Sequence, residues 1–256
     1  MEFSKMSRLS IVVVLCLYVA ALQEGADAKS LPSYVPICKR NDKNLNDCFK
    51  KATVVIRPYI TKGIPELNIP PIDPLMIPMV MLEQGTPAVN YKAKLKNLQV
   101  FGLRNYMFDN VHIDLNKLQI MGRISIPMIW LEADYDIKGR ALVLPIQGNG
   151  LFKANLTTVT ADVNIETKLV KKKGDEYLEP KSISTKFNIQ QATADFANLF
   201  NGDETLSRTT NQFLNDNAKD IVEEVKPAIE AVIAMLAEDI GGKVFATTPF
   251  NKLFPK

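Results

Sequence analysis

Residues 201–240 read NGDETLSRTTNQFLNDNAKDIVEEVKPAIEAVIAMLAEDI, and this stretch carries the longest regular pattern in the chain. Its apolar side chains recur every three or four residues, which is the spacing of one face of an α-helix. At 1.5 Å per residue such a helix is about 60 Å long. Most of the remaining sequence has β-strand patterns, so only a β-sheet can cover the apolar face of this helix. The positions of that face are Leu206, Phe213, Ile221, Val225, Ile229, Val232, Leu236 and Ile240.

The predicted helix changes character along its length. Its first half has a charged side, whereas nearly every residue from 227 to 237 is apolar. A helix that is apolar on all sides is normally enclosed by protein. Glu230 and Glu238 interrupt the apolar stretch, which argues against a membrane span. Asn201 and Glu204 form a candidate N-terminal capping box, and a kink is expected at Pro227.

The N-terminus has the pattern of a secretion signal. Lys5 and Arg8 precede an apolar run at 11–22, and the sequence Ala-Asp-Ala at 26–28 fits a cleavage site. A run of about 12 residues is short for a bilayer span, and an uncleaved anchor is the alternative. We therefore expect residues 1–28 to be a signal peptide, residues 29–256 to form a single domain, and the mature protein to be extracellular.

Two cysteines, Cys38 and Cys48, follow the predicted signal, whereas Cys16 lies within it. In an oxidising compartment two thiols this close in sequence usually form a disulfide. A metal site is the alternative, but no histidine lies near this pair. We expect a structural disulfide and no metal.

The charge of the chain is mildly basic, with a formal net charge of +3. One basic run at 171–173 precedes Gly174 and is typical of a hairpin tip, with a site for an anionic partner as the alternative. Nothing in the charge pattern indicates a nucleic-acid surface.

Two segments precede the strands. Residues 45–60 have helical spacing, and Gly63 is a suitable residue to end that helix. Residues 64–78 contain five prolines among apolar side chains. Proline removes backbone donors, so we expect an extended apolar strap packed on the body, rather than a central strand.

Four later segments alternate apolar and polar side chains, as antiparallel strands with one wet face do. The alternation changes phase after Lys117, which predicts a β-bulge. Glycines between 120 and 152 predict bends in a strongly curved sheet. The predicted fold is therefore of the α+β class, with a long C-terminal helix wrapped by a highly curved antiparallel sheet and a short N-terminal helix. The alternating segments are 89–96, 111–115, 159–169 and 183–189.

A glycosylation sequon, Asn-Leu-Thr, begins at Asn155. Lys153, Asn155 and Thr157 share one side of their predicted strand. We therefore expect Asn155 to face water and to be available for an N-linked glycan.

Catalytic chemistry is not evident in the sequence. The only histidine, His112, falls on the polar side of its predicted strand, and no phosphate loop or nucleophile elbow occurs. Asp134 and Asp136 share one predicted solvent face. A carboxylate pair of a glycosidase is not singled out by any pattern, and we predict that the protein is not an enzyme.

Several strings, in order along the chain, resemble the takeout and juvenile-hormone-binding protein family of insect secreted proteins. Together they extend from residue 38 to residue 255 and so cover almost the whole predicted mature chain. The strings are CKRNDKNLNDC at 38–48, IRPYITKGIPEL at 56–67, IPPIDPL at 69–75, LPIQGNGLF at 144–152, LFNG at 199–202, NQFLNDN at 211–217 and PFNKLFP at 249–255.

This resemblance implies a long helix wrapped by a curved sheet around a hydrophobic tunnel. It also implies binding of terpenoid hormones or fatty chains, and a link to circadian, feeding or hormone physiology. The pair Cys38 and Cys48 matches the disulfide common to the family. The second disulfide of the haemolymph hormone carriers has no cysteines here. The resemblance therefore favours the takeout branch and puts juvenile hormone itself in doubt.

We therefore predict a secreted, monomeric carrier of one elongated hydrophobic small molecule in haemolymph-type fluid. It would need no cofactor, bind no nucleic acid and not insert stably into a membrane. The alternative is a defence protein that binds lipid or lipopolysaccharide surfaces, and a secreted hydrolase ranks last. Packing of an ordinary core explains the predicted lining equally well. That lining is Met128, Trp130, Phe152, Phe213, Ile229, Val232, Ile233 and Leu236, with Ile72, Leu75 and Met76 of the strap near a mouth.

Overall fold

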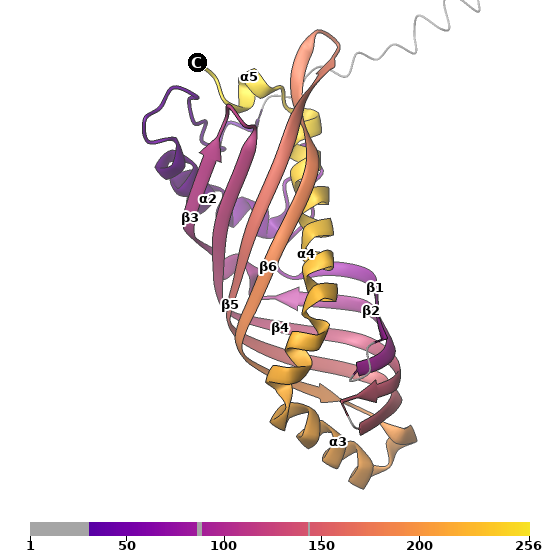
Figure 1. The fold of residues 1–256 in the computed structure, drawn as a ribbon. Helices are drawn as coiled ribbons and strands as arrows, with labels where there is room; N and C mark the ends of the chain where they lie inside the picture. The colour runs from indigo at the N-terminus through magenta and orange to yellow at the C-terminus, as the bar shows by residue number, and fades with distance from the viewer. Residues whose placement is uncertain (1–30, 86–88, 143) are drawn as a thin grey trace, which may run out of the picture.

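One antiparallel β-sheet curves around a long C-terminal helix in this computed structural model (Figure 1). The structure describes residues 31–85, 89–142 and 144–256. The predicted signal peptide at 1–28, with Cys16, lies outside the described residues. The predicted fold class is confirmed, because the curved sheet, the long helix and a shorter N-terminal helix are all present.

The sheet has the strand order β1-β2-β4-β5-β6, and β3 also pairs with β4. β4 uses its N-terminal part to pair with β3 and its C-terminal part to pair with β2. The sheet therefore has two sections along the length of β4, β5 and β6, which we call the β3 section and the β2 section. The strands are β1 (Leu75–Gly85), β2 (Val89–Phe101), β3 (Met107–Asp114), β4 (Gln119–Ala141), β5 (Leu144–Lys172) and β6 (Asp175–Phe196).

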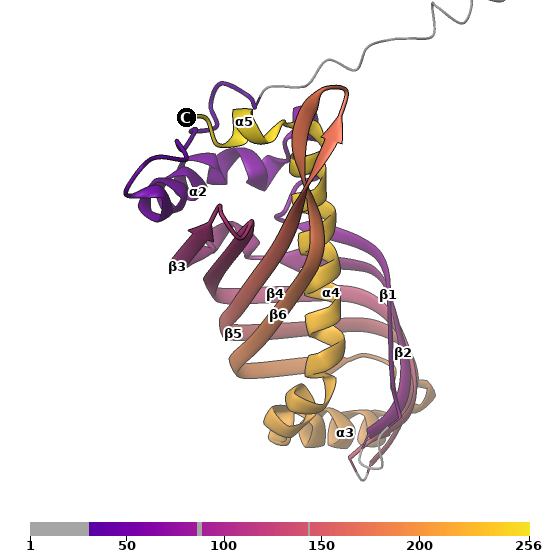
Figure 2. The same cartoon turned by 45° about the horizontal axis from the view of Figure 1, so that its top comes forward.

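Helices cover the two ends and close the open side of the sheet (Figure 2). The N-terminal helix ends where the sequence predicted, with Gly63 as its C-cap. The helices are α2 (Leu45–Lys62), α3 (Glu204–Asp216), α4 (Ala218–Thr247) and α5 (Phe250–Leu253), with short 3₁₀ turns η1 (Pro65–Leu67), η2 (Leu103–Asn105) and η3 (Phe200–Gly202).

The predicted single helix at 201–240 is two helices, and the break lies at Asn217 rather than at Pro227. The Asn217 side chain donates to the carbonyl of Phe213 at 2.8 Å, beside the bond that its own backbone N–H makes to the same carbonyl at 3.1 Å. Such a local side-chain bond competes with regular helix and fits a break at this residue. α4 continues through Pro227, which lies on its exposed side. The predicted capping box is also wrong, since the N-cap of α3 is Asp203.

The structure also decides three predictions about the strands, of which one is wrong. The change of phase after Lys117 is a hairpin turn, with Asp114 paired to Gln119, and not a β-bulge. The end of the proline strap forms the start of β1. β1 is an edge strand, and proline is tolerated there because the open side of an edge strand makes no ladder bonds. The basic run forms a hairpin tip as predicted, with Lys172 paired to Asp175.

The free edge of β6 is covered by side chains of α3. Asn211 accepts from the backbone N–H of Phe196 at 2.9 Å and donates to its carbonyl at 3.0 Å. Asn215 makes the same pair of bonds with Ala194, both at 2.8 Å. Each amide therefore replaces a residue of a missing neighbouring strand. Unpaired edge groups are a liability in a sheet, and these bonds remove it.

α4 continues this attachment along β6. The Glu230 carboxylate accepts from the backbone N–H of Phe187 at 2.9 Å, and the Thr185 hydroxyl donates to the Glu230 carbonyl at 2.8 Å. α4 also contacts β1, the strand at the opposite edge of the sheet. The helix thus lies across the gap between the two edges, as Figure 1 shows.

The two ends of the described chain meet over α2. Cys38 and Cys48 form the predicted disulfide. Tyr34 stacks on Tyr59 of α2 with ring centroids 4.0 Å apart. Arg40 donates through Nε to the carbonyl of Phe254 at 2.7 Å, which fixes the C-terminal segment against the N-terminal one.

Among the described helices, none combines the length and the apolar character needed to cross a bilayer.

Replacement of Asn215 by alanine should destabilise the protein by about 1–3 kcal/mol, because both edge groups of Ala194 lose their partner. Urea unfolding followed by circular dichroism measures this loss. The matched control is Gln212→Ala on the exposed side of the same helix, with an expected change within about 0.5 kcal/mol. Equal losses in the two variants would show that the amide bonds to β6 contribute nothing particular.

Candidate functional site

α4 is the most apolar helix of the described chain, yet none of its residues is fully buried. Its exposed positions recur at helical spacing and form one stripe toward solvent. The prediction that its second half is enclosed on all sides is therefore wrong. Met235, at 68% exposure, lies on this stripe. The stripe consists of Glu223, Pro227, Ala231, Met235 and Glu238.

The opposite side of α4 packs on the concave face of the sheet. Ile229 and Ile233 contact a cluster formed by Ile129, Val159 and Phe187 of β4, β5 and β6. This cluster lies where the two sections of the sheet meet, because Ile129 stands between the part of β4 that pairs with β3 and the part that pairs with β2. Further along, Val225 and Val232 pack on the core of the β2 section. That section is therefore filled by its own side chains together with those of the helices.

The β3 section is filled less completely. By register, a set of apolar positions there shares the concave face with Val159 and Phe187. Val159 and Phe187 are buried, but the members of this set are only partly buried. These inward side chains therefore keep apolar surface that protein does not cover. The set is Ile120, Ile124, Ala161, Val163 and Ile165.

The second half of α4 runs beside this section. Glu230 bonds to Phe187 of β6, and Phe245 packs near Leu178 at the other end of the same strand. The helical turns between them include Leu236, which is partly buried and belongs to none of the described core clusters. We call the concave face of the β3 section together with this part of α4 the interior face. It is the candidate ligand surface.

The predicted lining residues fall into three groups. Ile72, Leu75 and Phe152 are buried, and Phe152 packs on Phe196 with ring centroids 4.9 Å apart. Five positions on α3 and α4 are partly buried, and three of these face the core clusters named above. Contact with a ligand stays a prediction for all of them. These five are Phe213, Ile229, Val232, Ile233 and Leu236.

Of the other three predicted residues, Met128 and Trp130 do not lie in the interior, whereas Met76, which was expected near a mouth, is exposed and stays a prediction. Met76 is 54% exposed, Met128 38% and Trp130 43%. Met128 and Trp130 flank buried Ile129 on their strand, so they point to the outer face. Every residue of the sequence at 126–131, IPMIWL, is apolar, so alternation does not tell the inward-facing positions from the outward-facing ones. The ladder also changes phase here, since Thr158 has a left-handed φ of 51°.

Three interior residues were missed by the sequence reasoning: Ile129, Val159 and Phe187. The alternating patterns at 159–169 and 183–189 already placed Val159 and Phe187 on an apolar face. The missing information was which strands lie beside α4. That neighbourhood depends on long-range pairing, which periodicity does not contain.

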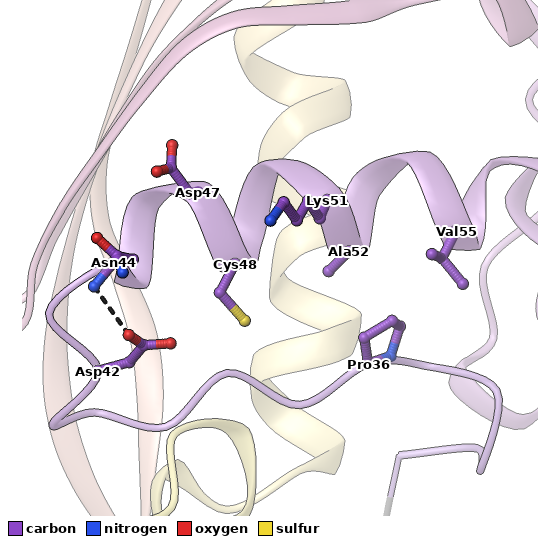
Figure 3. Close-up of a pocket in the computed structure, with 8 residues that line it drawn as sticks. All are labelled: Pro36, Asp42, Asn44, Asp47, Cys48, Lys51, Ala52 and Val55. Atoms are coloured by element: carbon purple, nitrogen blue, oxygen red, sulfur yellow. Dashed lines mark hydrogen bonds between the residues drawn. The ribbon is translucent and has the colours of Figure 1, made fainter.

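A separate recess of about 410 Å³ lies between the N-terminal segment and α2. Figure 3 shows Asp42, Asp47 and Lys51 around it, together with Cys48 of the disulfide. The backbone N–H of Asn44 donates to Asp42 at 2.8 Å at its rim. This mixed polar lining does not match an elongated apolar molecule.

Catalytic groups are not assembled in the described part of the chain. His112, Asp134 and Asp136 are exposed on the sheet, and Asp134 accepts a hydrogen bond from Asn97 at 2.9 Å. No group of three metal-ligating side chains occurs among the described residues. Tyr135 is buried in the β2 section, where its hydroxyl donates to the carbonyl of Ala197 at 2.6 Å.

A curved sheet closed by one long helix over an apolar interior face is the architecture of proteins that bind hydrophobic molecules. The chain belongs to the haemolymph juvenile hormone binding protein family, because the family model matches residues 12–255. Takeout 1 of Epiphyas postvittana has the same fold. Its crystal structure superposes with a TM-score of 0.76 at 26% identity, covering 87% of this chain and 100% of that one.

Two curated relatives are similar over most of their length. The circadian clock-controlled protein daywake of Drosophila melanogaster is 25% identical over 237 residues, which is 90% of each chain. A protein of Schistocerca gregaria whose name refers to β-carotene binding is 23% identical over 202 residues, which is 77% of this chain and 79% of that protein.

Burial raises the pKa of Tyr135 to about 12, with a smaller contribution from the negative charge of Asp195. The folded protein therefore holds this proton more tightly than the unfolded chain, whose tyrosines titrate near pH 10. The contribution of neutral Tyr135 to the free energy of unfolding is therefore complete below about pH 10 and should be lost between about pH 10 and 12. Tyrosinate absorbance of the protein and of Tyr135→Phe measures this titration. The difference between the two titration curves is the titration of Tyr135. If that difference is centred near pH 10, the raised pKa of Tyr135 is contradicted.

Proposed function

We propose that this protein is a secreted carrier that holds one elongated hydrophobic small molecule against the interior face. The observation that carries the proposal is that the most apolar helix has no fully buried residue. Apolar side chains left partly uncovered lose hydrophobic stabilisation. A bound apolar chain beside Leu236 and Val163 would restore it.

The energetics favour a long ligand. Burial of about 10–15 methylene groups at about 0.8 kcal/mol each gives about 8–12 kcal/mol before costs. Loss of ligand motion and imperfect fit reduce this value, so micromolar to nanomolar affinity is expected. A carrier needs release as well as uptake, and this range permits both.

The relatives support an apolar ligand of extended shape. The family description names juvenile hormone, and one relative is named for β-carotene. Both molecules are long isoprenoid chains. The chain lacks cysteines for a second disulfide. With the match to Takeout 1, this favours a takeout-like ligand over juvenile hormone itself. The similarity to daywake supports a link to circadian physiology.

Secretion is supported by the signal pattern at 1–28 and by the Cys38–Cys48 disulfide. We propose that the mature protein begins near residue 29 and acts as a monomer in extracellular fluid. We propose no enzymatic activity for it.

Replacement of Leu236 by asparagine should weaken binding of a fluorescent fatty-acid probe about tenfold or more, because a polar amide would face the bound chain. Fluorescence titration of the purified protein measures this loss. Met235→Asn is the matched control, since Met235 is the adjacent residue on the solvent stripe and is 68% exposed. Circular dichroism should show both variants folded. A folded Leu236→Asn variant with unchanged probe affinity would refute the assignment of the interior face.

The second candidate function is binding to an anionic lipid surface, and one depression favours it. A recess of about 390 Å³ between α2 and η2 is lined by Arg57, Lys62 and Arg104, with Val54 beside them. Arg104 is ion-paired with Asp73 at 3.3 Å, so Arg57 and Lys62 are the basic groups offered to a ligand. Val54 is exposed, and Arg57 lies over the ring of Tyr106 at 5.0 Å. A basic hollow next to an exposed apolar side chain suits a phosphate headgroup and the start of an acyl chain.

Binding to vesicles with anionic lipid should fall when Arg57 and Lys62 are both changed to glutamine. Each basic residue near such a surface contributes about 1 kcal/mol, so the double variant should bind about 10–30 times more weakly. Co-sedimentation at low and high salt measures this, with Lys138→Gln on the exposed sheet as the control. No binding by the unmodified protein at low salt would eliminate this candidate.

A further inference from the structure

The outer face of the sheet carries an exposed aromatic residue directly beside the sequon. Trp130 of β4 pairs with Asn155 of β5 in the antiparallel ladder. The indole is 43% exposed, and Asn155 is exposed. Directly opposed residues have Cβ atoms about 4.5–5.5 Å apart, and their side chains point to the same side of the sheet. The two side chains are therefore neighbours on the outer surface.

The opposite flank of the indole is already occupied. On the β2 side Trp130 pairs with Phe101, and Gly102 follows. A Cβ atom at Gly102 would lie 3.4 Å from the ring atom Cζ3, so the chain at Gly102 lies close beside the indole. The flank toward β5 has only the short Asn155 side chain as its direct neighbour. Space for a group attached to Asn155 thus lies on that flank.

The surroundings suit carbohydrate better than a protein partner. Beyond Trp130 on the same face, Met128 is 38% exposed and pairs with Thr157. On the other side an ion pair joins Lys153 to Glu132 at 3.7 Å. Trp130, Met128 and the partly buried Phe101, among polar groups, make a patch far smaller than a stable protein interface. A pyranose ring has one face of C–H groups and a rim of hydroxyls, which matches an indole surrounded by polar side chains.

We propose that Asn155 carries an N-linked glycan whose first N-acetylglucosamine packs on the indole of Trp130. The inference rests on the proposed secretion, since that route supplies the lipid-linked oligosaccharide diphosphate donor. The Nδ2 atom of Asn155 forms a bond to C1 of the sugar. The bond between C1 and the diphosphate oxygen breaks, the lipid diphosphate leaves with the bonding electrons, and the proton lost from the amide passes to solvent. The attached sugar then shields the outer patch of Trp130 and Met128 from water.

The sequence makes a direct test available, because Trp130 is the only tryptophan and Asn155 begins the only sequon. The full chain is secreted from eukaryotic cells that produce high-mannose glycans. Intact mass before and after removal of the glycan reports occupancy. Acrylamide quenching of tryptophan fluorescence reports access to the indole. The same sequence refolded from bacteria is the unglycosylated reference.

We expect a glycan at Asn155, weaker quenching than in the bacterial protein, and an emission shift to the blue. Trimming to a single N-acetylglucosamine should retain this protection, and complete removal should abolish it. Thr157→Ala, which keeps Asn155 but destroys the sequon, should behave as the bacterial protein. Thr193→Ala, a control at the position paired with Asn155 on its other side, should behave as the glycosylated protein.

Two outcomes would overturn the proposal. Secreted protein without a glycan at Asn155 removes the modification itself. Glycosylated protein with the same quenching as the bacterial protein removes the contact with Trp130. Neither outcome concerns probe binding at the interior face, so failure here is distinct from failure of the carrier function.

Discussion

The attachment of the C-terminal helices to the free edge of β6 is the interaction on which the rest of the structure depends. A curved sheet that does not close leaves two edges with unpaired backbone groups. Here Asn211, Asn215 and Glu230 satisfy the edge of β6 from the helix side. The helix is therefore fixed beside one edge and reaches β1 at the other. Because α4 is apolar and is held across the open side of the sheet, the concave side of the sheet becomes an interior face.

This attachment explains why the interior face can remain incompletely packed. Most helices are held in place by burial of an apolar stripe. α4 is held also by directional bonds to the sheet edge, at Thr185 and Phe187. Side chains further along, such as Leu236, then need not be packed as tightly as a core requires. The same helix can thus support the fold near Glu230 and present apolar surface to a ligand beyond it.

The sequence was sufficient for the overall fold because each element is amphipathic at its own period. Alternation at 159–169 and 183–189 identified strands, and the residues at 201–240 identified the helix region. The sequence was not sufficient to place the break in the helix, because more than one residue in 201–240 could have caused it. Proline was expected to kink α4, but it lies on the exposed side, and the chain turns at Asn217, whose backbone N–H and side-chain amide both donate to the carbonyl of Phe213.

The candidate site was predicted only in part, for a related reason. The α4 residues were identified from helical spacing, whereas Met128 and Trp130 were assigned to the interior from a segment that is apolar on both sides. Only the pairing of Trp130 with Asn155 and of Ile129 with Leu156 separates the two faces. Glu230, an apparent interruption of an apolar stretch, is a bond between helix and sheet. Long-range partners decide such cases.

Native mass spectrometry of protein purified from its own source is the decisive test of the carrier function. We expect one hydrophobic molecule per chain, released on denaturation and identified by solvent extraction. We also expect the stripped protein to take up one equivalent again. Protein that carries no such molecule, and takes up none when an apolar chain is supplied, would contradict the carrier function.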